Sequence, residues 1–169
     1  MTQPTKLSLD SINRMSRSEF VVSLGGIFEH SSWVAEKAWE GRPFSSGSAL
    51  HEAMMQAVTD SPEETVIAFL RAHPDLGTRL KVTDYSASEQ QGAGLDRLSP
   101  EEYETFSSLN REYVLKFGFP FILAVRGRNK EEILEAMKRR VNNGVSEERE
   151  EALRQIKRIT RFRLDDLLE

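Results

Sequence analysis

His73 has a sequence position that suits proton transfer. Val66 and Leu70 share one face of an expected helix, and at about 100° per residue His73 continues that face. Pro74 disfavours the helical conformation for the residue before it, so the helix is expected to end at His73. A histidine at an inward-facing helix end could move a proton, and it equally fits a half-buried structural histidine or a C-terminal cation.

A second candidate group lies between Ser86 and Gln90. Ser86 precedes Glu89 by three residues, which is the capping-box spacing, so a purely structural role is open to Glu89. Gly92 and Gly94 follow, and each costs about 1 kcal/mol in a helix relative to alanine. The pair therefore predicts a close approach of the backbone to another helix or to a ligand. Gln90 adds a neutral donor and acceptor near a helix start that suits an anionic ligand.

Arg163 interrupts the apolar stripe of the expected last helix. Ile156 and Leu164 belong to this stripe, and Arg163 falls inside it, whereas Arg161 falls largely outside. An inward arginine needs an anion, because an unpaired buried charge is very costly. That anion is either a protein carboxylate or a substrate carboxylate gripped by the guanidinium fork. A third possibility is a stem on apolar surface with its head in water.

An apolar run follows the helix stop at Gly118. Residues 119–125 are expected to be extended, helped by Pro120. The backbone N–H and C=O groups of such a run need partners. Filling the core is the default role, and a substrate with amide or urea groups could pair with the same backbone.

The elements around these groups are expected to be helices. Period-2 alternation is nearly absent, and apolar residues recur at three and four, as in residues 103–117 and 133–141. Helix starts are marked by capping-box pairs at Ser16–Glu19, Ser61–Glu64, Ser86–Glu89, Ser99–Glu102 and, more weakly, Asn129–Glu132. We therefore expect an all-α fold, a single compact domain over residues 1–169 with seven or eight helices, counting 31–40, 48–59 and a long last helix.

Composition excludes several classes of function. The chain has 169 residues, 38% of them hydrophobic, with a net charge of −4 and no cysteine. A dedicated nucleic-acid binder would usually be basic, and disulfides, thiolate metal sites and cysteine nucleophiles are impossible. The apolar run 117–125 is too short to span a bilayer, and no signal peptide is visible. We expect a cytoplasmic protein without nucleic-acid or membrane partners.

Familiar catalytic motifs fail in this sequence. His51-Glu52 begins like a zinc-protease helix, but Met55 stands where the second histidine belongs. The three histidines are far apart, and no glycine-rich phosphate loop or Gly-x-Ser-x-Gly elbow occurs. An enzyme with this sequence is expected to use no metal and no organic cofactor, although a loosely held magnesium stays open.

Four ordered motifs together resemble the 2-oxo-4-hydroxy-4-carboxy-5-ureidoimidazoline decarboxylase family. The motifs are His73-Pro74-Asp75-Leu76-Gly77, Ser86-x-x-Glu89-Gln90-x-x-Ala93-Gly94-Leu95, Phe117-Gly118-Phe119-Pro120-Phe121-Ile122 and Arg161-Phe162-Arg163-Leu164. The resemblance spans nearly the whole chain. The sequence is also similar to the N-terminal decarboxylase half of bacillus-type bifunctional enzymes whose other half is a urate oxidase. The chain is then either an excised domain or a stand-alone enzyme.

The resemblance implies a fold, an activity and a site. The family is all-helical, cofactor-free and often homodimeric, and it converts the ureidoimidazoline acid, a small molecule, to (S)-allantoin and carbon dioxide late in urate degradation. His73 is implied as the main catalytic residue, with Glu89 beside it and Arg163 as the catalytic arginine; Arg161 is the alternative. The implied substrate contacts are Pro74, Ser86, Glu89, Gln90, Phe121, Ile122, Leu123, Ala124 and Val125.

The implied chemistry needs positioning, anion stabilisation and one-sided protonation. The substrate's own C=N and carbonyl groups can accept the electron pair that decarboxylation leaves. His73 is expected to handle the proton, Glu89 to set the charge of His73 or bind a ring N–H, and Arg163 to anchor an anionic or carbonyl group. Two rival functions stay open: a non-catalytic helical binding module, and a hydrolase acting on a ureide ring.

Overall fold

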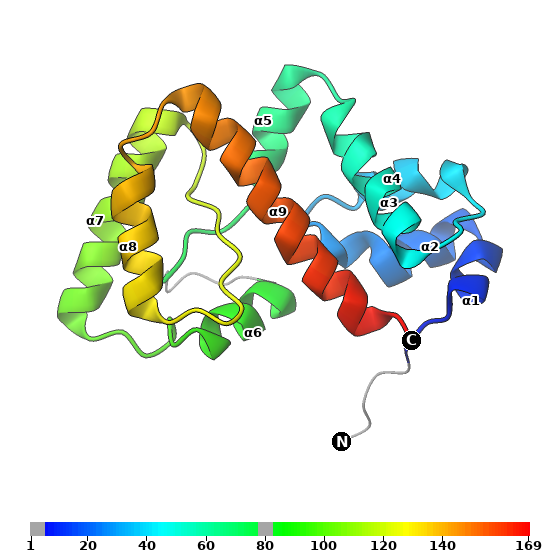
Figure 1. Cartoon of the computed structure of the whole chain (residues 1–169), viewed down its shortest axis with the longest axis horizontal. Helices are drawn as coiled ribbons and strands as arrows, with labels where there is room; N and C mark the ends of the chain where they lie inside the picture. Colours follow the sequence, from blue (N-terminus) through cyan, green and yellow to red (C-terminus); the bar gives the residue numbers. More distant parts are fainter. Residues whose placement is uncertain (1–5, 78–82) are drawn as a thin grey trace. The chain divides into compact units, whose positions relative to one another are not determined.

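The computed structural model describes residues 6–77 and 83–169. Within these ranges the regular structure is nine α-helices and two 3₁₀ helices, with an isolated bridge between Leu7 and Leu168 (Figure 1). The all-α prediction is confirmed. The additional helix is α1 (Leu9–Arg14), which Ser8 caps through the Ser11 amide at 3.1 Å. Its six residues bury only Ile12, so its apolar pattern is too short to detect.

Contacts divide the chain into two compact units. The first comprises residues 1–69 together with 157–169, and the second comprises residues 70–156. Two helices contribute residues to both units, α5 (Glu63–Arg71) and α9 (Val145–Leu167). A single domain over residues 1–169 stays a prediction.

The first unit is built from short helices on an apolar core. Its elements are α1, α2 (Arg17–Leu24), the 3₁₀ turn Gly25–Ile27, α3 (Trp33–Ala38), the 3₁₀ turn Trp39–Gly41, α4 (Gly47–Thr59) and the ends of α5 and α9 that belong to it. Helix α3 packs against α2 and α4. Phe20, Leu50 and Met54 are fully buried there. Leu7 joins the end of α9, because its amide donates to the Leu167 carbonyl at 2.7 Å.

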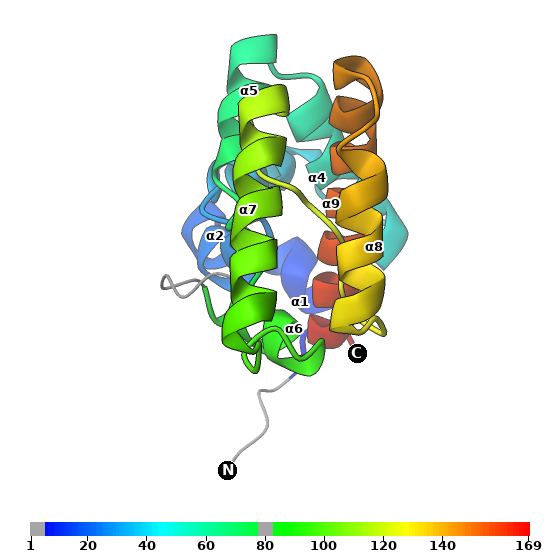
Figure 2. The same ribbon diagram turned by 90° about the vertical axis from the view of Figure 1, so that its left-hand side faces the viewer.

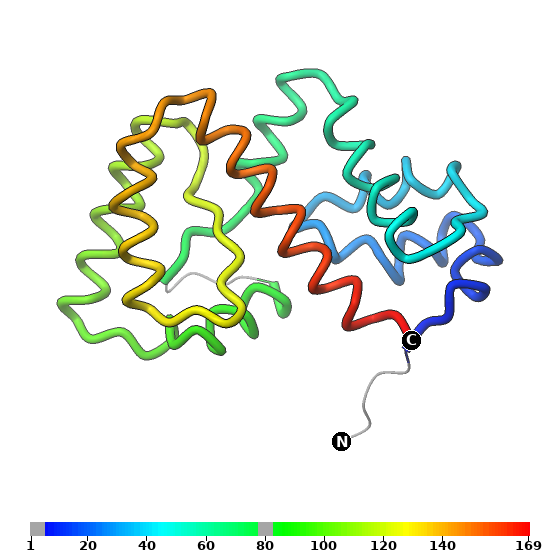
Figure 3. Tube along the Cα trace, in the orientation of Figure 1, coloured from blue at the N-terminus to red at the C-terminus, as the bar shows by residue number. Residues whose placement is uncertain are grey.

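The second unit contains α6 (Asp84–Gly92), α7 (Pro100–Phe117) and α8 (Lys130–Arg140), with the first turns of α9. Helices α7 and α8 run side by side in Figures 1 and 2 and are in contact. Residues 119–125 form an open, non-helical trace between them in the sequence, drawn in yellow in Figure 3. The ring of Tyr113 meets the rings of Phe119 and Phe121 edge-on, at 6.0 and 5.4 Å between centroids. The segment is therefore packed into the core of this unit.

Three of the predicted capping boxes are present. Ser16, Ser99 and Asn129 each accept from the amide three residues on, and the glutamate there accepts from the cap amide. Helix α5 starts close to Ser61 as expected, at Glu63. Helix α9 begins at Val145, several residues before its predicted apolar marker Leu153. Among the helices of the described ranges, none combines the length and the apolar character needed to cross a membrane.

Candidate active site

His73 lies just beyond the end of α5, where the sequence predicts it. The helix ends at Arg71, and the His73 amide still donates to the Leu70 carbonyl at 3.3 Å. The side chain of His73 is half-buried and belongs to the unit of residues 70–156. Because Pro74 follows, the chain leaves the helix at this point as a loop over residues 73–77.

Two buried amide side chains hold the far end of this loop. Asn110 on α7 donates from Nδ2 to the Leu76 carbonyl at 2.9 Å, and Gln90 on α6 accepts from the Gly77 amide at 3.0 Å. The Leu76 carbonyl and the Gly77 amide belong to one peptide group, so both of its polar atoms are fixed. Gly77 also has a φ of +73°, and an added Cβ would meet Leu98 Cδ1 at 3.0 Å. The loop therefore has a defined geometry next to His73.

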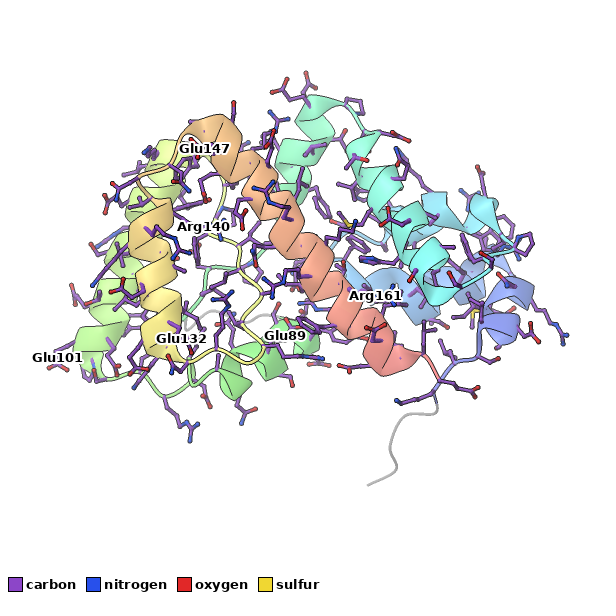
Figure 4. The ribbon with its side chains drawn as sticks, viewed as in Figure 1. Glu89, Glu101, Glu132, Arg140, Glu147 and Arg161 are labelled. Carbon is purple, nitrogen blue, oxygen red and sulfur yellow. The ribbon has the colours of Figure 1, made fainter. Side chains whose placement is uncertain are left out.

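Helix α6 begins before the capping box that the sequence predicts at Ser86 and Glu89. Thr83 is its N-cap and accepts from the Ser86 amide at 3.3 Å. The capping-box prediction for Ser86 and Glu89 is therefore wrong. Ser86 and Gln90 are buried and Glu89 is half-buried, which places the three on the inward side of α6. Figure 4 labels Glu89 on this helix.

Gly92 and Gly94 do not mark a close approach to another helix. An added Cβ at either position would meet nothing within 4 Å, so this alternative is wrong, and the approach of a ligand stays a prediction. Gly94 has a φ of +83°, which glycine adopts without strain, and it carries the chain out of α6. The Leu95 amide then returns to the Gln90 carbonyl at 2.9 Å. Nothing in the structure explains the glycine at position 92.

The side-chain amide nitrogen of Gln90 is a buried hydrogen-bond donor that lacks an acceptor among the described residues. Gln90 is 8% exposed, and within the described ranges its Nε2 atom has no hydrogen-bond partner. Leaving a buried donor unpaired costs about 1–3 kcal/mol, so such groups are rare outside functional sites. A carbonyl or anionic oxygen of a ligand would supply the missing acceptor. The position of this donor, one residue from Glu89, makes the inward side of α6 a candidate binding surface.

Side chains from the second unit hold the segment at residues 121–125. Arg140 on α8 donates from Nη1 to the Ile122 carbonyl at 2.7 Å, and Gln155 on α9 accepts from the Ala124 amide at 3.1 Å. Arg128 donates to the Ala124 carbonyl at 3.2 Å. The five residues Phe121, Ile122, Leu123, Ala124 and Val125 are all buried. The protein thus uses side chains, in place of a neighbouring strand, to satisfy part of this backbone.

Arg163 faces inward as predicted, and it forms an ion pair with a protein carboxylate, that of Glu29. Its Nη1 atom lies 3.2 Å from Glu29 Oε1 and donates to the Ile27 carbonyl at 2.9 Å. Arg163 and Glu29 are both buried in the unit that contains residues 157–169. Arg161 is more exposed, pairs with Asp165 at 3.0 Å and donates to Ser48. His73 and Glu89 both belong to the other unit, where the described link between their segments is the hydrogen bond from the Gly77 amide to Gln90, the neighbour of Glu89.

A buried cluster around Arg140 is absent from the sequence prediction. Glu148 accepts from Arg140 Nε at 2.8 Å, from the Tyr113 hydroxyl at 2.6 Å and from Asn143 at 2.9 Å. Burial and the adjacent Glu148 raise the pKa of Tyr113, so its proton stays on the phenol. A signal for Arg140 does exist in the sequence. It lies three residues after Met137, on the apolar stripe of α8.

Two further titratable groups have shifted pKa values. Burial lowers the pKa of His51, with a smaller contribution from Arg161, and its Nε2 atom lies 2.9 Å from Thr160 Oγ1. His51 is therefore a satisfied core histidine. Burial raises the pKa of Asp75, in the loop that follows His73. Over the part of the chain that the structure describes, no group of three or more His, Cys, Asp or Glu side chains could hold a metal ion.

His73, Glu89 and the backbone of residues 121–125 all belong to the helical unit of residues 70–156. Comparisons with known proteins specify the class to which this protein belongs. The family model for OHCU decarboxylase matches residues 13–165. The 2-oxo-4-hydroxy-4-carboxy-5-ureidoimidazoline decarboxylase of Haloferax volcanii is 47% identical over 159 residues, covering 94% of this chain and 95% of that protein. Its namesake from Halalkalicoccus jeotgali is 43% identical over 163 residues, 96% of this chain and 93% of the relative.

Longer relatives and solved structures agree with this family. The uric acid degradation bifunctional protein PucL of Bacillus subtilis is 45% identical over 161 residues, which is 95% of this chain and 33% of that protein. This chain thus spans about a third of the bifunctional relative. A crystal structure of (S)-allantoin synthase matches with a TM-score of 0.78 and 32% identity, covering 96% of this chain and 54% of that one. A crystal structure of OHCU decarboxylase in the presence of (S)-allantoin matches with a TM-score of 0.69 and 25% identity, covering 90% and 98%.

The chain belongs to the OHCU decarboxylase family.

Proposed function

We propose that this protein decarboxylates 2-oxo-4-hydroxy-4-carboxy-5-ureidoimidazoline to (S)-allantoin and carbon dioxide, at a site built on His73 and Glu89. The observation that carries the activity is 43–47% identity, over nearly the whole chain, to relatives named for this decarboxylation. The protein is then a lyase that acts on a small molecule at the end of the conversion of urate to allantoin. The reaction as proposed involves no metal and no organic cofactor.

The substrate can carry the electrons of this reaction itself. The bond between C4 and its carboxylate breaks and carbon dioxide leaves. The electron pair of this bond forms a C4=C5 double bond, and the π electrons of C5=N move to the ring nitrogen, which takes up a proton. The 4-hydroxyl then loses its proton and becomes the carbonyl while C5 takes up a proton, which creates the stereocentre of the product. The protein must hold the carboxylate out of the ring plane, stabilise the developing anion and deliver the proton to one face.

His73 is proposed to engage the 4-hydroxyl and carboxylate end of the substrate and to handle the proton. Its place at the start of a loop whose Leu76–Gly77 peptide is fixed on both sides supports this role. A side chain that is already placed loses little entropy when the substrate binds, and pre-organisation is a large part of enzymatic rate enhancement. Pro74 adjoins this group as a proposed substrate contact.

Glu89 is proposed to set the charge state of His73 or to bind a ring N–H. Support comes from the half-buried position of Glu89 on α6, next to Gln90, whose side-chain oxygen binds the loop that follows His73. Ser86 and Gln90, on the same inward side, are proposed substrate contacts, and the unpaired Nε2 of Gln90 is a ready donor for a substrate oxygen. The backbone of residues 121–125 is proposed to pair with the ureido group.

Arg163 is proposed to anchor an anionic or carbonyl group of the substrate, with Arg161 as the alternative. Arg163 is buried and faces inward, and a guanidinium fork suits a carboxylate or carbonyl oxygen of the substrate. Its Nη1 contacts with Glu29 and the Ile27 carbonyl would orient the side chain for this role. A substitution at each arginine separates the two assignments.

We also propose that the chain is one domain, that it forms a homodimer and that it acts with a urate oxidase or is fused to one. The bifunctional relatives support the proposed association with a urate oxidase.

The proposed dimer interface lies on α7. A hollow of about 600 Å³ lies against this helix, with Leu115 exposed at its edge and Asp75 and Arg111 in its wall. An exposed leucine beside a hollow that carries one acidic and one basic residue can be complementary to the same surface on a second copy of the chain.

The activity is tested with substrate made immediately before use. Urate is treated with urate oxidase and hydroxyisourate hydrolase, this protein is added, and circular dichroism follows the formation of allantoin. We expect formation of one enantiomer, (S)-allantoin, at a rate well above the spontaneous decay. Racemic product at the spontaneous rate, from protein that is folded, would overturn the proposed function.

A further inference from the structure

We propose that Arg140 and Gln155 are positioning residues for the decarboxylation, because they hold the backbone of residues 121–125 in the form that meets the substrate. This inference rests on the proposed function, in which that backbone pairs with the ureido group. Neither side chain is expected to touch the substrate. Each acts through the main-chain group that it binds, the Ile122 carbonyl for Arg140 and the Ala124 amide for Gln155.

The spacing of the two contacts matches an extended chain. In such a chain the N–H and C=O groups of one residue point to one edge, and those of the next residue point to the opposite edge. Ile122 and Ala124 are two residues apart, and the Ala124 carbonyl is bound on the same pattern by Arg128 at 3.2 Å. One edge of the segment is therefore fixed by protein side chains. The N–H and C=O groups of Leu123 then face the opposite edge, where a group with both a donor and an acceptor, such as a ureide, could pair.

The guanidinium of Arg140 is itself held in place, so it can in turn fix the position of the Ile122 carbonyl. Its Nε atom donates to Glu148 at 2.8 Å, and the guanidinium lies 4.5 Å from the centre of the Phe121 ring. Arg140 is 3% exposed and Glu148 is fully buried. Figure 4 shows Arg140 on α8. Glu148 is fixed in turn by the Tyr113 hydroxyl at 2.6 Å, so the orientation of the guanidinium is determined on two sides.

The buried ion pair of Arg140 and Glu148 would be an inefficient way to stabilise the fold alone. Burying an ion pair usually gains little over an apolar pair of the same size, because both ions must leave water. Arg140 also keeps one donor, Nη2, without a hydrogen-bond partner in the described ranges. What the pair provides and an apolar pair does not is a directed hydrogen bond to the Ile122 carbonyl at 2.7 Å. Gln155 is tied in a similar way, because its Nε2 atom donates to Glu151 at 2.8 Å.

The test compares four variants of the whole chain. Arg140→Lys keeps the charge beside Glu148 and shortens the reach to Ile122, and Gln155→Met removes the acceptor for the Ala124 amide at nearly constant volume. Gln155→Glu combined with Glu151→Gln restores the acceptor for Ala124 and exchanges the donor and acceptor of the pair at 151 and 155, which avoids two facing carboxylates. Arg139→Met is the matched control, because Arg139 is the exposed neighbour of Arg140 on α8. Thermal unfolding of each variant establishes that it is folded under the assay conditions.

The readouts are kcat, KM and the Kd of the product (S)-allantoin measured by calorimetry. We expect Arg140→Lys and Gln155→Met to raise KM and the Kd of the product by about tenfold, the size of one well-placed hydrogen bond. The exchange Glu151→Gln with Gln155→Glu should recover most of the loss, and Arg139→Met should match the wild type. A merely structural role would lower the active fraction, and hence kcat, while KM and Kd stayed constant.

The outcomes separate this inference from the proposed function. An active wild type with unchanged KM and product Kd in both Arg140→Lys and Gln155→Met would overturn the positioning role and leave the decarboxylase activity intact. A wild type without activity would overturn the proposed function, and the positioning role with it. If Arg140→Lys does not fold, the comparison of Gln155→Met with the exchange Glu151→Gln and Gln155→Glu decides the question alone.

Discussion

The side-chain oxygen of Gln90 accepts a hydrogen bond from the amide of Gly77 at 3.0 Å. This contact ties the helix that carries Glu89 to the loop that begins at His73, so the relative placement of the two proposed catalytic groups depends on one buried amide. The nitrogen of the same amide group has no hydrogen-bond partner among the described residues. Gln90 is therefore expected to matter for both stability and catalysis.

Replacing Gln90 with leucine should show both effects. Gln90→Leu leaves the Gly77 amide buried without its acceptor, which should lower the free energy of unfolding by about 1–3 kcal/mol. It also removes the Nε2 donor and releases the loop, so kcat/KM should fall by about tenfold or more. Denaturant unfolding and steady-state kinetics measure the two effects. The exposed neighbour Gln91, changed to leucine, is the control, and an equal effect at both positions would contradict the structural assignment.

Glu148→Gln should destabilise the second unit strongly. The substitution removes the negative charge that Arg140 needs at full burial, and breaking a buried ion pair on one side costs about 3–5 kcal/mol. Glu147→Gln, one residue earlier on the exposed side of α9, should change stability by less than about 0.5 kcal/mol. Chemical denaturation of the two variants provides the comparison. Similar unfolding midpoints would show that the cluster does not hold the fold.

The stability contributed by Asp75 should depend on pH with a defined sign. Burial raises the pKa of Asp75 in the folded protein above its ordinary value of 3.8. The folded state therefore keeps this proton to higher pH than the unfolded chain, and stability falls as the pH rises from 3.8 through the raised pKa. Asp75→Asn should be more stable than the wild type near pH 7, and the difference should vanish near pH 3.5. A difference that does not change with pH would contradict the shifted pKa.

The face of α7 around Leu115 should control the oligomeric state. Leu115 is 87% exposed beside the hollow that contains Asp75 and Arg111, so Leu115→Glu should convert a dimer to a monomer. Val22 on α2 is 85% exposed and lies in the other unit, which makes Val22→Glu a matched control. Size-exclusion chromatography with light scattering gives the masses. A wild-type monomer, or a dimer that Leu115→Glu leaves intact, would contradict the proposed interface.

Much of the helical structure could be predicted from local signals. The capping boxes at Ser16, Ser99 and Asn129 form as the sequence indicates, because each depends on groups within one turn. The inward position of Arg163 follows from helical periodicity in the same way. These features need no knowledge of distant residues, which explains why spacing alone was sufficient.

The failures involve competition or partners that spacing cannot reveal. Thr83 and Ser86 are both good caps, and the helix is capped by the earlier residue, whose hydroxyl accepts from the Ser86 amide, while Ser86 is buried inside α6. The glycines at 92 and 94 do not approach another helix, which was one of the two expected explanations. The contacts of Gln90 with Gly77 and of Arg140 with Ile122 join residues that are 13 and 18 positions apart, and these depend on the tertiary fold.

The role of His73 is tested most directly by single-turnover kinetics. Freshly made substrate is mixed with an excess of wild type, His73→Ala or Glu89→Gln, and circular dichroism follows (S)-allantoin. His73→Ala should slow the chemical step by about 10²-fold or more while the protein stays folded, because a general acid–base group contributes on this scale. Turnover by folded His73→Ala at the wild-type rate, with product of the same single hand, would contradict decarboxylation at His73.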